Sequence, residues 1–412
     1  MRRLAVCVVL MTASFAVPAS ADDQVPLPTP LRVGDAMRIA RTRRLEVIAA
    51  RARARGAAER PAIVSALDDP EVFGSIDHLP FMGGGVDASF TIEQRFPLSS
   101  IRGDRRRAAE AGARRELAIA DKAGLDVELE AASAFWMLAE LRERAKLVDD
   151  QRAPADQMAA AATARFSTSA GIQADVLRAQ LEVDRLAGEQ RALVADQRAA
   201  EAMLDTSLAR SPDAPIPELD IAVSDAEPPA ATAIASTALA NRPELRAGRA
   251  EVARSEAEVS AMESMYSPMA MVRTGPSYTM ADGAGWMVMV GVSIPLWRGK
   301  LRAGVNEARA MTDMASADLE AMRRMIGGEA TAARERVAAA RERYLALRDR
   351  IVPRARQTIA PNLTAYAANQ TPLVSAIEAA QALWETQREL AMARAELGLA
   401  WARLHRTTGE TP

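Results

Sequence analysis

An internal duplication constrains this chain more than any other feature of its sequence. The second half matches the first at an offset of 198 residues near the start, as between Arg44 and Arg242, and of 200 residues farther on, as between Phe166 and Tyr366. Single identities arise by chance in a chain rich in alanine and arginine, but prolines and strand patterns matching in order do not. The 412 residues therefore predict one protomer of two repeats, not the two or three globular domains that their number suggests. The matched pairs at the smaller offset are Ala40/Ala238, Arg44/Arg242, Glu46/Glu244, Arg51/Arg249, Pro70/Pro268 and Pro97/Pro295.

The repeats meet at a proline-rich joint. We assign residues 22–210 to the first repeat, 211–228 to the joint and 229–412 to the second repeat. A helix cannot continue through the joint, because it holds the prolines Pro212, Pro215, Pro217 and Pro228.

Each repeat has the same predicted order of elements: a helix, two strands and a very long helical hairpin. The first helices are expected at 35–66 and 231–264, and the first strand of each pair at about 70–79 and 268–278. Long helical patterns follow at 101–165 and 299–364, interrupted mainly near Pro154 and Pro353. The final returning helix has a coiled-coil interval, since leucines recur every seventh residue at Leu383, Leu390, Leu397 and Leu404.

The second strand of each pair alternates apolar and polar residues. Phe90 and Ile92 alternate with Asp87, Thr91 and Glu93. A period of two predicts a sheet with one apolar and one polar face. In the second repeat Trp286, Val288 and Val290 occupy the matching apolar positions. In a membrane, the apolar set would meet lipid and the polar set would face the lumen.

Composition excludes several classes of function. Aromatic residues make up only 4% of the chain while 49% is hydrophobic, which suits long packed helices better than a bulky globular core. The net charge of −2 gives no basic field for nucleic acid. One cysteine, Cys7, and two histidines, His78 and His405, leave little for disulfide, metal or triad chemistry. Without a catalytic motif, the chain is predicted to be neither an enzyme nor a protein with a cofactor or metal site.

The N-terminus predicts export. Residues 1–21 read as a signal peptide, with Arg2 and Arg3 before an apolar stretch and a cleavage site at Ala19-Ser20-Ala21. Cleavage would remove Cys7, so a lipid anchor on an N-terminal cysteine is not expected.

The turns of the long hairpins carry a family resemblance. The first runs Phe166-Ser-Thr-Ser-Ala-Gly-Ile-Gln-Ala-Asp175-Val176-Leu177, and the second runs Tyr366-Ala-Ala-Asn-Gln-Thr-Pro-Leu-Val-Ser375-Ala-Ile377. With the duplicated strand pairs, whose four strands leave exposed edges, these turns resemble the TolC-like outer-membrane efflux proteins over nearly the whole mature chain.

The resemblance implies a fold and an assembly. The fold is mainly helical, and three protomers with four strands each form a 12-stranded outer-membrane β-barrel continued by a periplasmic α-barrel. The expected function is a passive exit duct of a tripartite efflux system, in contact with a periplasmic adaptor (membrane fusion) protein, an inner-membrane pump and outer-membrane lipid. Alternatives are a drug-efflux or type I secretion duct and, in another class, a soluble periplasmic coiled-coil adaptor or scaffold.

Motifs around the strands resemble the heavy-metal efflux branch. They include Ala66-Leu-Asp-Asp-Pro70-Glu-Val, Gln94-Arg95-Phe96-Pro97, Arg273-Thr-Gly-Pro-Ser277-Tyr278 and Gly291-Val-Ser-Ile-Pro295-Leu296. This branch resemblance implies heavy-metal cations as the exported solute. The methionines between Met262 and Met325 are soft potential ligands, but as adaptable apolar filler they need no function.

The resemblance also implies the functional residues. Asp175 and Glu378 are candidates for the periplasmic gate, where threefold acid rings would favour cations. Alternatively, Asp175 pairs with Arg178 and Glu378 is a solvated helix residue. The family's turn glycine is replaced by Ser169 and Asn369, with Gly171 two places later. The expected adaptor-contact residues are Phe166, Thr168, Ser169, Ala170, Gly171, Tyr366, Ala368, Asn369 and Gln370.

Overall fold

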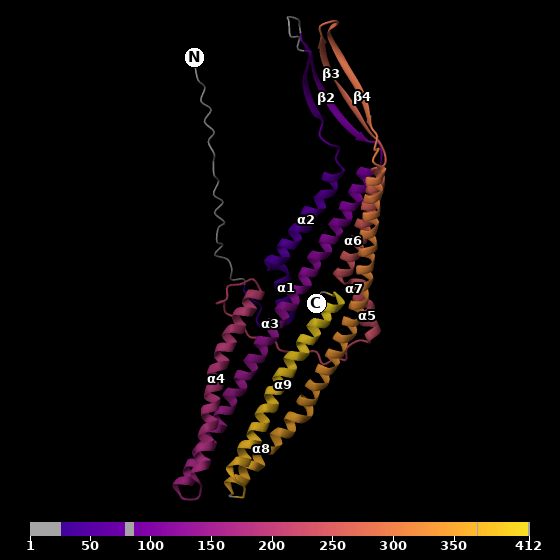
Figure 1. Ribbon diagram of the computed structural model, residues 1–412. Coiled ribbons are helices and arrows are strands. Elements are labelled where there is room, and N and C mark those ends of the chain that lie inside the picture. Colours follow the sequence, from indigo (N-terminus) through magenta and orange to yellow (C-terminus); the bar gives the residue numbers. More distant parts are fainter. Residues whose placement is uncertain (1–25, 79–85, 369, 411–412) are drawn as a thin grey trace, which may run out of the picture.

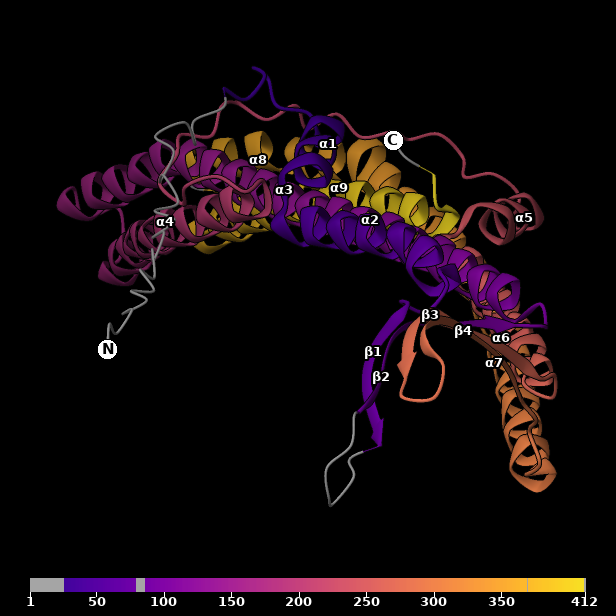
Figure 2. The same cartoon turned by 90° about the horizontal axis from the view of Figure 1, so that it is seen from above.

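The computed structural model describes residues 26–78, 86–368 and 370–410 (Figure 1). The molecule is elongated, with the strands at one end and the turns of two helical hairpins at the other. Seen from above, the helices form a curved wall, not a closed bundle (Figure 2). The predicted signal peptide lies outside the described residues.

Each predicted first helix is broken into two at an arginine. The first repeat begins with α1 (Val33–Arg43) and α2 (Leu45–Ser65), and the second with α5 (Ala231–Asn241) and α6 (Pro243–Ser264). At the breaks, Arg44 and Arg242 have ψ angles of 129° and 128°. Pro243 explains the second break, because a proline disfavours helical geometry in the residue before it.

The same ion pairs hold both breaks. Arg44 donates to Glu46 and to Glu130 of the following long helix. Arg242 likewise bonds Glu244 and Glu329. Equivalent arginines with equivalent partners are the structural counterpart of the duplication.

The four strands form one antiparallel sheet in the order β1 (Glu71–His78), β2 (Asp87–Pro97), β3 (Met269–Thr279) and β4 (Gly283–Ser293). The two predicted strand pairs are therefore present and joined through β2 and β3. Ile92 lies opposite Val72 and Thr274, and Thr274 lies opposite Val288. Cross-strand partners share a face, so this register gathers the predicted apolar residues on one side of the sheet.

The long helices differ between the repeats. In the first, α3 (Ile101–Ser167) runs 67 residues, about 100 Å, and passes through Pro154 without a break. In the second, α7 (Arg298–Ala346) and α8 (Val352–Ala367) are separated by a π-helical turn, η1 (Leu347–Ile351). The expected interruption is thus confirmed near Pro353 but wrong at Pro154. The carbonyl that Pro154 leaves unbonded belongs to Asp150, an exposed residue that water can reach.

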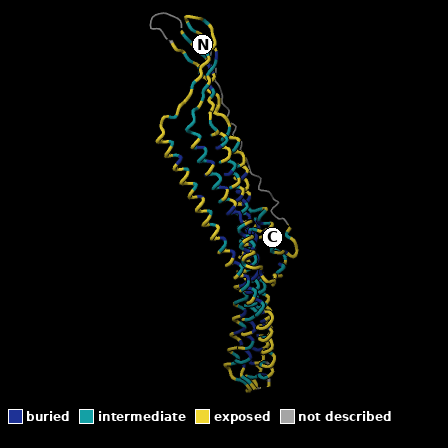
Figure 3. The backbone as a smooth tube through the Cα atoms, turned by 90° about the vertical axis from the view of Figure 1, so that its right-hand side faces the viewer, coloured by how far each residue is buried: buried dark blue, intermediate teal, exposed yellow. Residues whose placement is uncertain are grey.

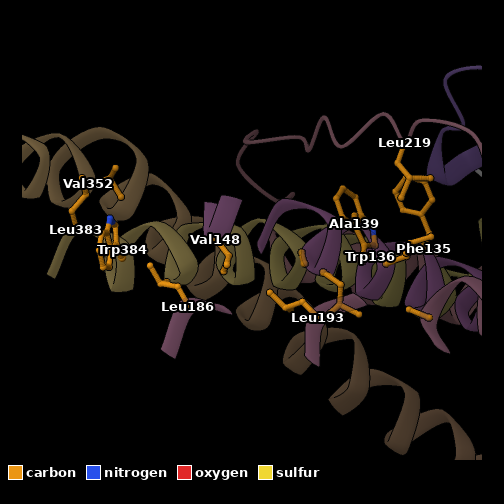
Figure 4. Close-up of a cluster of buried hydrophobic side chains, with 14 of the residues drawn as sticks. Phe135, Trp136, Ala139, Val148, Leu186, Leu193, Leu219, Val352, Leu383 and Trp384 are labelled. Atoms are coloured by element: carbon orange, nitrogen blue, oxygen red, sulfur yellow. The ribbon is translucent and has the colours of Figure 1, made fainter. Parts of the chain in front are cut away.

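The hairpins are completed by α4 (Gln173–Ser207) and α9 (Leu373–Thr408). Buried side chains lie mainly between helices, whereas the sheet is largely exposed or intermediate (Figure 3). The main cluster joins both hairpins and includes Phe135 and Trp136, whose rings meet edge to face at 5.3 Å (Figure 4). The proline-rich joint, residues 211–228, crosses the helical wall, and its Leu219 forms an isolated parallel β-bridge with Leu31.

Candidate functional site

The turn of the first hairpin closes with a helix-ending motif that does not use glycine in the left-handed position. Ser169 has φ 58°, its N–H bonds the carbonyl of Phe166 at 3.0 Å, and the N–H of Ala170 bonds that of Arg165 at 2.9 Å. These are the two bonds of a Schellman motif, which usually places glycine where Ser169 stands. Gly171 is closely packed, since a Cβ there would lie 3.2 Å from the Phe166 nitrogen, a tighter contact than side chains usually make.

The second turn repeats the outer bond of this motif. The N–H of Gln370 bonds the carbonyl of Ala365 at 2.8 Å, as Ala170 does with Arg165. Asn369 lies outside the described residues. The two turns are adjacent at the same end of the molecule (Figure 1).

Arg165 ties the two hairpins together at this end. Its Nη1 donates to the carbonyl oxygen of Tyr366 at 2.8 Å, and its guanidinium lies 4.6 Å from the centre of the Tyr366 ring. A charged hydrogen bond and a cation–π contact therefore join the end of α3 to the end of α8. We call this pair the tip latch.

Polar contacts continue along the seam between α4 and α9. Gln381 donates to Glu182 at 2.9 Å, and Arg388 donates to Glu189 at 3.1 Å. Both pairs join residues 199 positions apart, so equivalent levels of the two returning helices face each other. The hairpins stand side by side in register.

The predicted gate acids flank this seam. Asp175 lies half-buried in the first turn of α4, seven residues before Glu182 and thus on a similar face of the helix. Glu378 is exposed on α9, three residues before Gln381. Within the described ranges neither acid forms an ion pair, and the alternative Asp175–Arg178 pair is not formed.

The predicted adaptor contacts differ in accessibility. Phe166 is 47% exposed, and Thr168, Ser169, Ala170, Ala368 and Gln370 are also exposed, while Gly171 is intermediate. Tyr366 is only 6% exposed and lies against Arg165. In this chain its side chain therefore packs inside the molecule.

At the opposite end, the polar face of the sheet holds a compact charged cluster. Glu93, 2% exposed, accepts from Arg95 at 3.1 Å and from Arg273 at 2.5 Å. Arg273 also stacks on Phe73 at 4.5 Å. The apolar face carries Phe90, Ile92, Trp286, Val288 and Val290, all exposed. The expected segregation of the two faces is present.

Four methionines lie on the polar face of the sheet. Met289 of β4 lies opposite Arg273 of β3 in the strand register. Met287, Met271 and Met269 are an even number of residues from these two along their strands, so they lie on the same side of the sheet. Met269 and Met289 are exposed and the other two are intermediate, so these sulfurs do not fill a core.

A buried carboxylate lies at the far end of α4. Asp205 has no exposed surface and sits 3.4 Å from Arg210. Burial raises its pKa to about 6, because the nearby Arg210 only partly offsets the loss of hydration. The intervening Ala209 is left-handed, with φ 55°.

Sequence reasoning missed Arg165, Arg95 and Arg273. The first precedes the named turn by one residue, and its role appears only when the two hairpins are juxtaposed. Arg95 had a usable signal, since it lies on the same alternating strand as Asp87 and Glu93, whereas Arg273 lies on β3 and meets Glu93 only through the pairing of β2 with β3. Among the described residues no cluster of three metal-ligating His, Cys, Asp or Glu side chains occurs, and no helix there combines the length and apolarity required to cross a membrane.

Comparisons agree with this architecture. Residues 234–410 match the outer membrane efflux protein family, while no curated protein matches the sequence. The outer-membrane channel OprN is 17% identical with a TM-score of 0.79, covering 92% of this chain and 89% of OprN. CusC, described as a transmembrane channel, is 12% identical with a TM-score of 0.79 and covers 92% of each chain. VceC of Vibrio cholerae is 14% identical with a TM-score of 0.77, covering 92% of this chain and 96% of VceC.

These matches confirm the TolC-like fold class, mainly helical with four strands per chain in duplicated repeats. The family match also confirms the predicted outer-membrane location with a periplasmic helical extension, and a channel instead of an enzyme.

Proposed function

We propose that this chain, whose second repeat matches the outer membrane efflux protein family and whose fold is that of the TolC-like channels, is the exit channel of a tripartite efflux system. It acts as a homotrimer that conducts solutes passively, and a periplasmic adaptor protein joins its hairpin tips to an inner-membrane pump. The observation that carries the proposal is the four-stranded sheet, which has one exposed apolar face and one polar face and lies at the end of a curved helical wall.

A soluble adaptor or scaffold would not need such a sheet. Its apolar face would stand in water, and its outer strands β1 and β4 would keep unpaired edges. Three copies side by side supply partners for both edges and leave the apolar face to lipid. If the mature protein fractionates as a soluble monomer instead of a trimer in outer membranes, the proposal is wrong.

We propose that the tips around residues 166–178 and 366–378 form the gate, and that the tip latch restrains it. Separation of the hairpins breaks the Arg165–Tyr366 contacts, since each residue belongs to a different hairpin. Asp175 and Glu378 beside the seam supply negative charge that favours cations. The exposed turn residues Phe166, Thr168, Ser169, Ala170, Ala368 and Gln370, with Gly171 and Asn369, are the proposed adaptor contacts.

Planar-bilayer recordings test the gate. Arg165→Gln and Tyr366→Leu are expected to raise conductance, whereas Tyr366→Phe is the matched control, because the latch uses the tyrosine ring and backbone carbonyl and not its hydroxyl. Asp175→Asn and Glu378→Gln are expected to lower cation preference. Unchanged conductance in both latch variants would refute the latch, and unchanged selectivity in both acid variants would refute the charge assignment.

We propose heavy-metal cations as the solute class. The branch motifs around the strands support this choice, and so do the four methionines on the polar face, because thioethers suit soft cations such as Cu(I) or Ag(I). The alternative is a drug-efflux or type I secretion duct with the same fold.

Replacing Met269, Met271, Met287 and Met289 together by leucine should lower silver or copper tolerance of a strain that depends on this channel. Met311→Leu with Met314→Leu is the control, because both are exposed methionines on α7 away from the sheet. Equal tolerance in all strains, or a phenotype confined to organic drugs when the gene is deleted, would favour the alternative.

A further inference from the structure

The path from β4 into α7 changes from apolar to basic within a few residues. From Trp286 to Leu296 every second residue along the chain belongs to the apolar side, and each of these residues is exposed. Trp297 follows directly, with 80% of its surface exposed. Arg298, Lys300 and Arg302 come next, and all three are exposed. Residues 294–306 contain no aspartate or glutamate.

The first repeat has the same transition between β2 and α3. Phe96 and Leu98 are exposed, and Arg102, Arg105 and Arg106 follow, also exposed. The acid among them, Asp104, is buried and bonded to Ser100, Ser264 and Arg107, so it does not neutralise the surface. We call the six exposed cations the basic collar: Arg102, Arg105, Arg106, Arg298, Lys300 and Arg302.

Local contacts account for only part of these cations. Arg106 pairs with Glu110 at 3.3 Å, Arg102 donates to the Ser65 carbonyl at 2.7 Å, and Arg298 lies 5.4 Å from the centre of the Tyr266 ring. The six cations lie in the first two turns of α3 and α7, and near a helix N-terminus the peptide dipoles disfavour positive charge and acids are the usual choice. Within the described parts of the chain, Arg105, Lys300 and Arg302 form no ion pair. Of the six cations only Arg106 is paired with an acid, Glu110, within those parts of the chain, so the collar keeps an excess of positive charge although the whole chain has a net charge of −2.

The neighbouring surface indicates the partner. A strand of 11 residues is about 36 Å long. At the tilt usual in membrane barrels its height is about 25 Å, which equals the height of the apolar band of an outer-membrane barrel. If the apolar face of the sheet lies in the membrane, its helix end is at the headgroup level of one leaflet. An exposed tryptophan at that level, with cations directly beyond it, is the usual arrangement of side chains at a lipid interface.

We infer that the basic collar binds the phosphate groups of anionic glycerophospholipids in the leaflet at the helix end of the strands. The inference rests on the proposed membrane function, because the collar meets headgroups only when the sheet is inserted. Each cation near such a surface strengthens binding about fivefold, and salt weakens the effect. The bound lipids would fix the depth of the channel in the membrane.

Native mass spectrometry of the trimer, with phosphatidylglycerol and phosphatidylcholine of identical acyl chains, tests the inference. The wild type should retain phosphatidylglycerol preferentially, and Lys300→Gln with Arg302→Gln should reduce that preference by at least about fivefold. The control is Arg323→Gln with Arg324→Gln, two exposed arginines about 30 Å farther along α7, which should leave the preference unchanged.

The outcomes separate the two proposals. Insertion into vesicles of either lipid is measured in parallel by conductance. If the trimer inserts but retains both lipids equally, or if the collar variant keeps the full preference, the lipid inference is refuted and the channel proposal stands. Failure to insert into vesicles of either composition would refute the channel proposal, and the inference with it.

Discussion

Gly398 of α9 lies where Trp136 of α3 crosses it, and a methyl group there should be strongly unfavourable. An alanine Cβ would stand 2.1 Å from Cε2 and 2.3 Å from Cζ2 of the indole. Carbon atoms pack at about 3.5 Å or more, so the ring must retreat by more than about 1 Å. It has little room, because Trp136 is buried and its edge meets Phe135.

The magnitude follows from two opposing terms. Overpacking of this kind costs about 1–3 kcal/mol, and replacing a helical glycine by alanine gains about 1 kcal/mol. Gly398→Ala should therefore destabilise the protein by up to about 2 kcal/mol, with more if the backbones of α3 and α9 must separate. Gly188→Ala in α4 is the matched control, since nothing lies within 4 Å of its Cβ position, and it should stabilise by about 1 kcal/mol.

Denaturant unfolding followed by the helical circular dichroism signal measures both variants, at equal protein concentration because the proposed trimer would contribute to stability. Trp136→Leu should remove most of the cost of Gly398→Ala in a double-mutant cycle, and the indole nitrogen has no hydrogen-bond partner among the described residues to lose. The reasoning fails if Gly398→Ala is as stabilising as Gly188→Ala, or if the cycle shows no coupling.

Three further predictions follow from local geometry and charge. Ser169→Gly and Ala209→Gly should each stabilise the chain by about 1 kcal/mol, because both residues are left-handed, and unchanged unfolding midpoints would contradict this. The pKa of Asp205 is raised by burial from 3.8 to about 6, so the native state binds the proton more tightly than the unfolded state does. The free energy of unfolding should therefore fall as the pH rises between these values. Asp205→Asn should flatten that part of the pH profile. The pKa of Glu244 is lowered to about 2, where burial is outweighed by the hydrogen bonds from Arg242 and Arg406. Arg406→Gln should therefore cost about 1–3 kcal/mol at neutral pH and less as the pH falls below about 4, which urea titrations at several pH values would check.

The repeat order and the strand faces were predictable from sequence because they depend on local periodicity. Phe90 and Ile92 alternate with Thr91 and Glu93, and a half-exposed sheet requires that pattern. The breaks at Arg44 and Arg242 were not predicted. The break at Arg44 depends partly on Glu130 of the following long helix, which no local pattern shows, whereas Pro243 was a local signal for the break at Arg242.

The tip residues show the same limit. The turns were located correctly, but Tyr366 is buried because Arg165 of the other hairpin covers it. The seam through Glu182 and Gln381 likewise joins helices almost 200 residues apart. Such contacts depend on how two long hairpins lie against each other, and sequence periodicity specifies each hairpin separately.

The π-helical turn preserves a trace of how the two repeats diverged. Their offset is 198 residues at Arg44 and Arg242, 199 between the partners Glu130 and Glu329, and 200 at Phe166 and Tyr366. The turn at 347–351 lies between the last two points. An inserted residue in a regular helix rotates everything after it by about 100°. The π-helical turn takes up the extra residue within a single wide turn, so the helix after it is not rotated. Tyr366 therefore still faces the first hairpin, although the second copy is longer by one residue in this stretch.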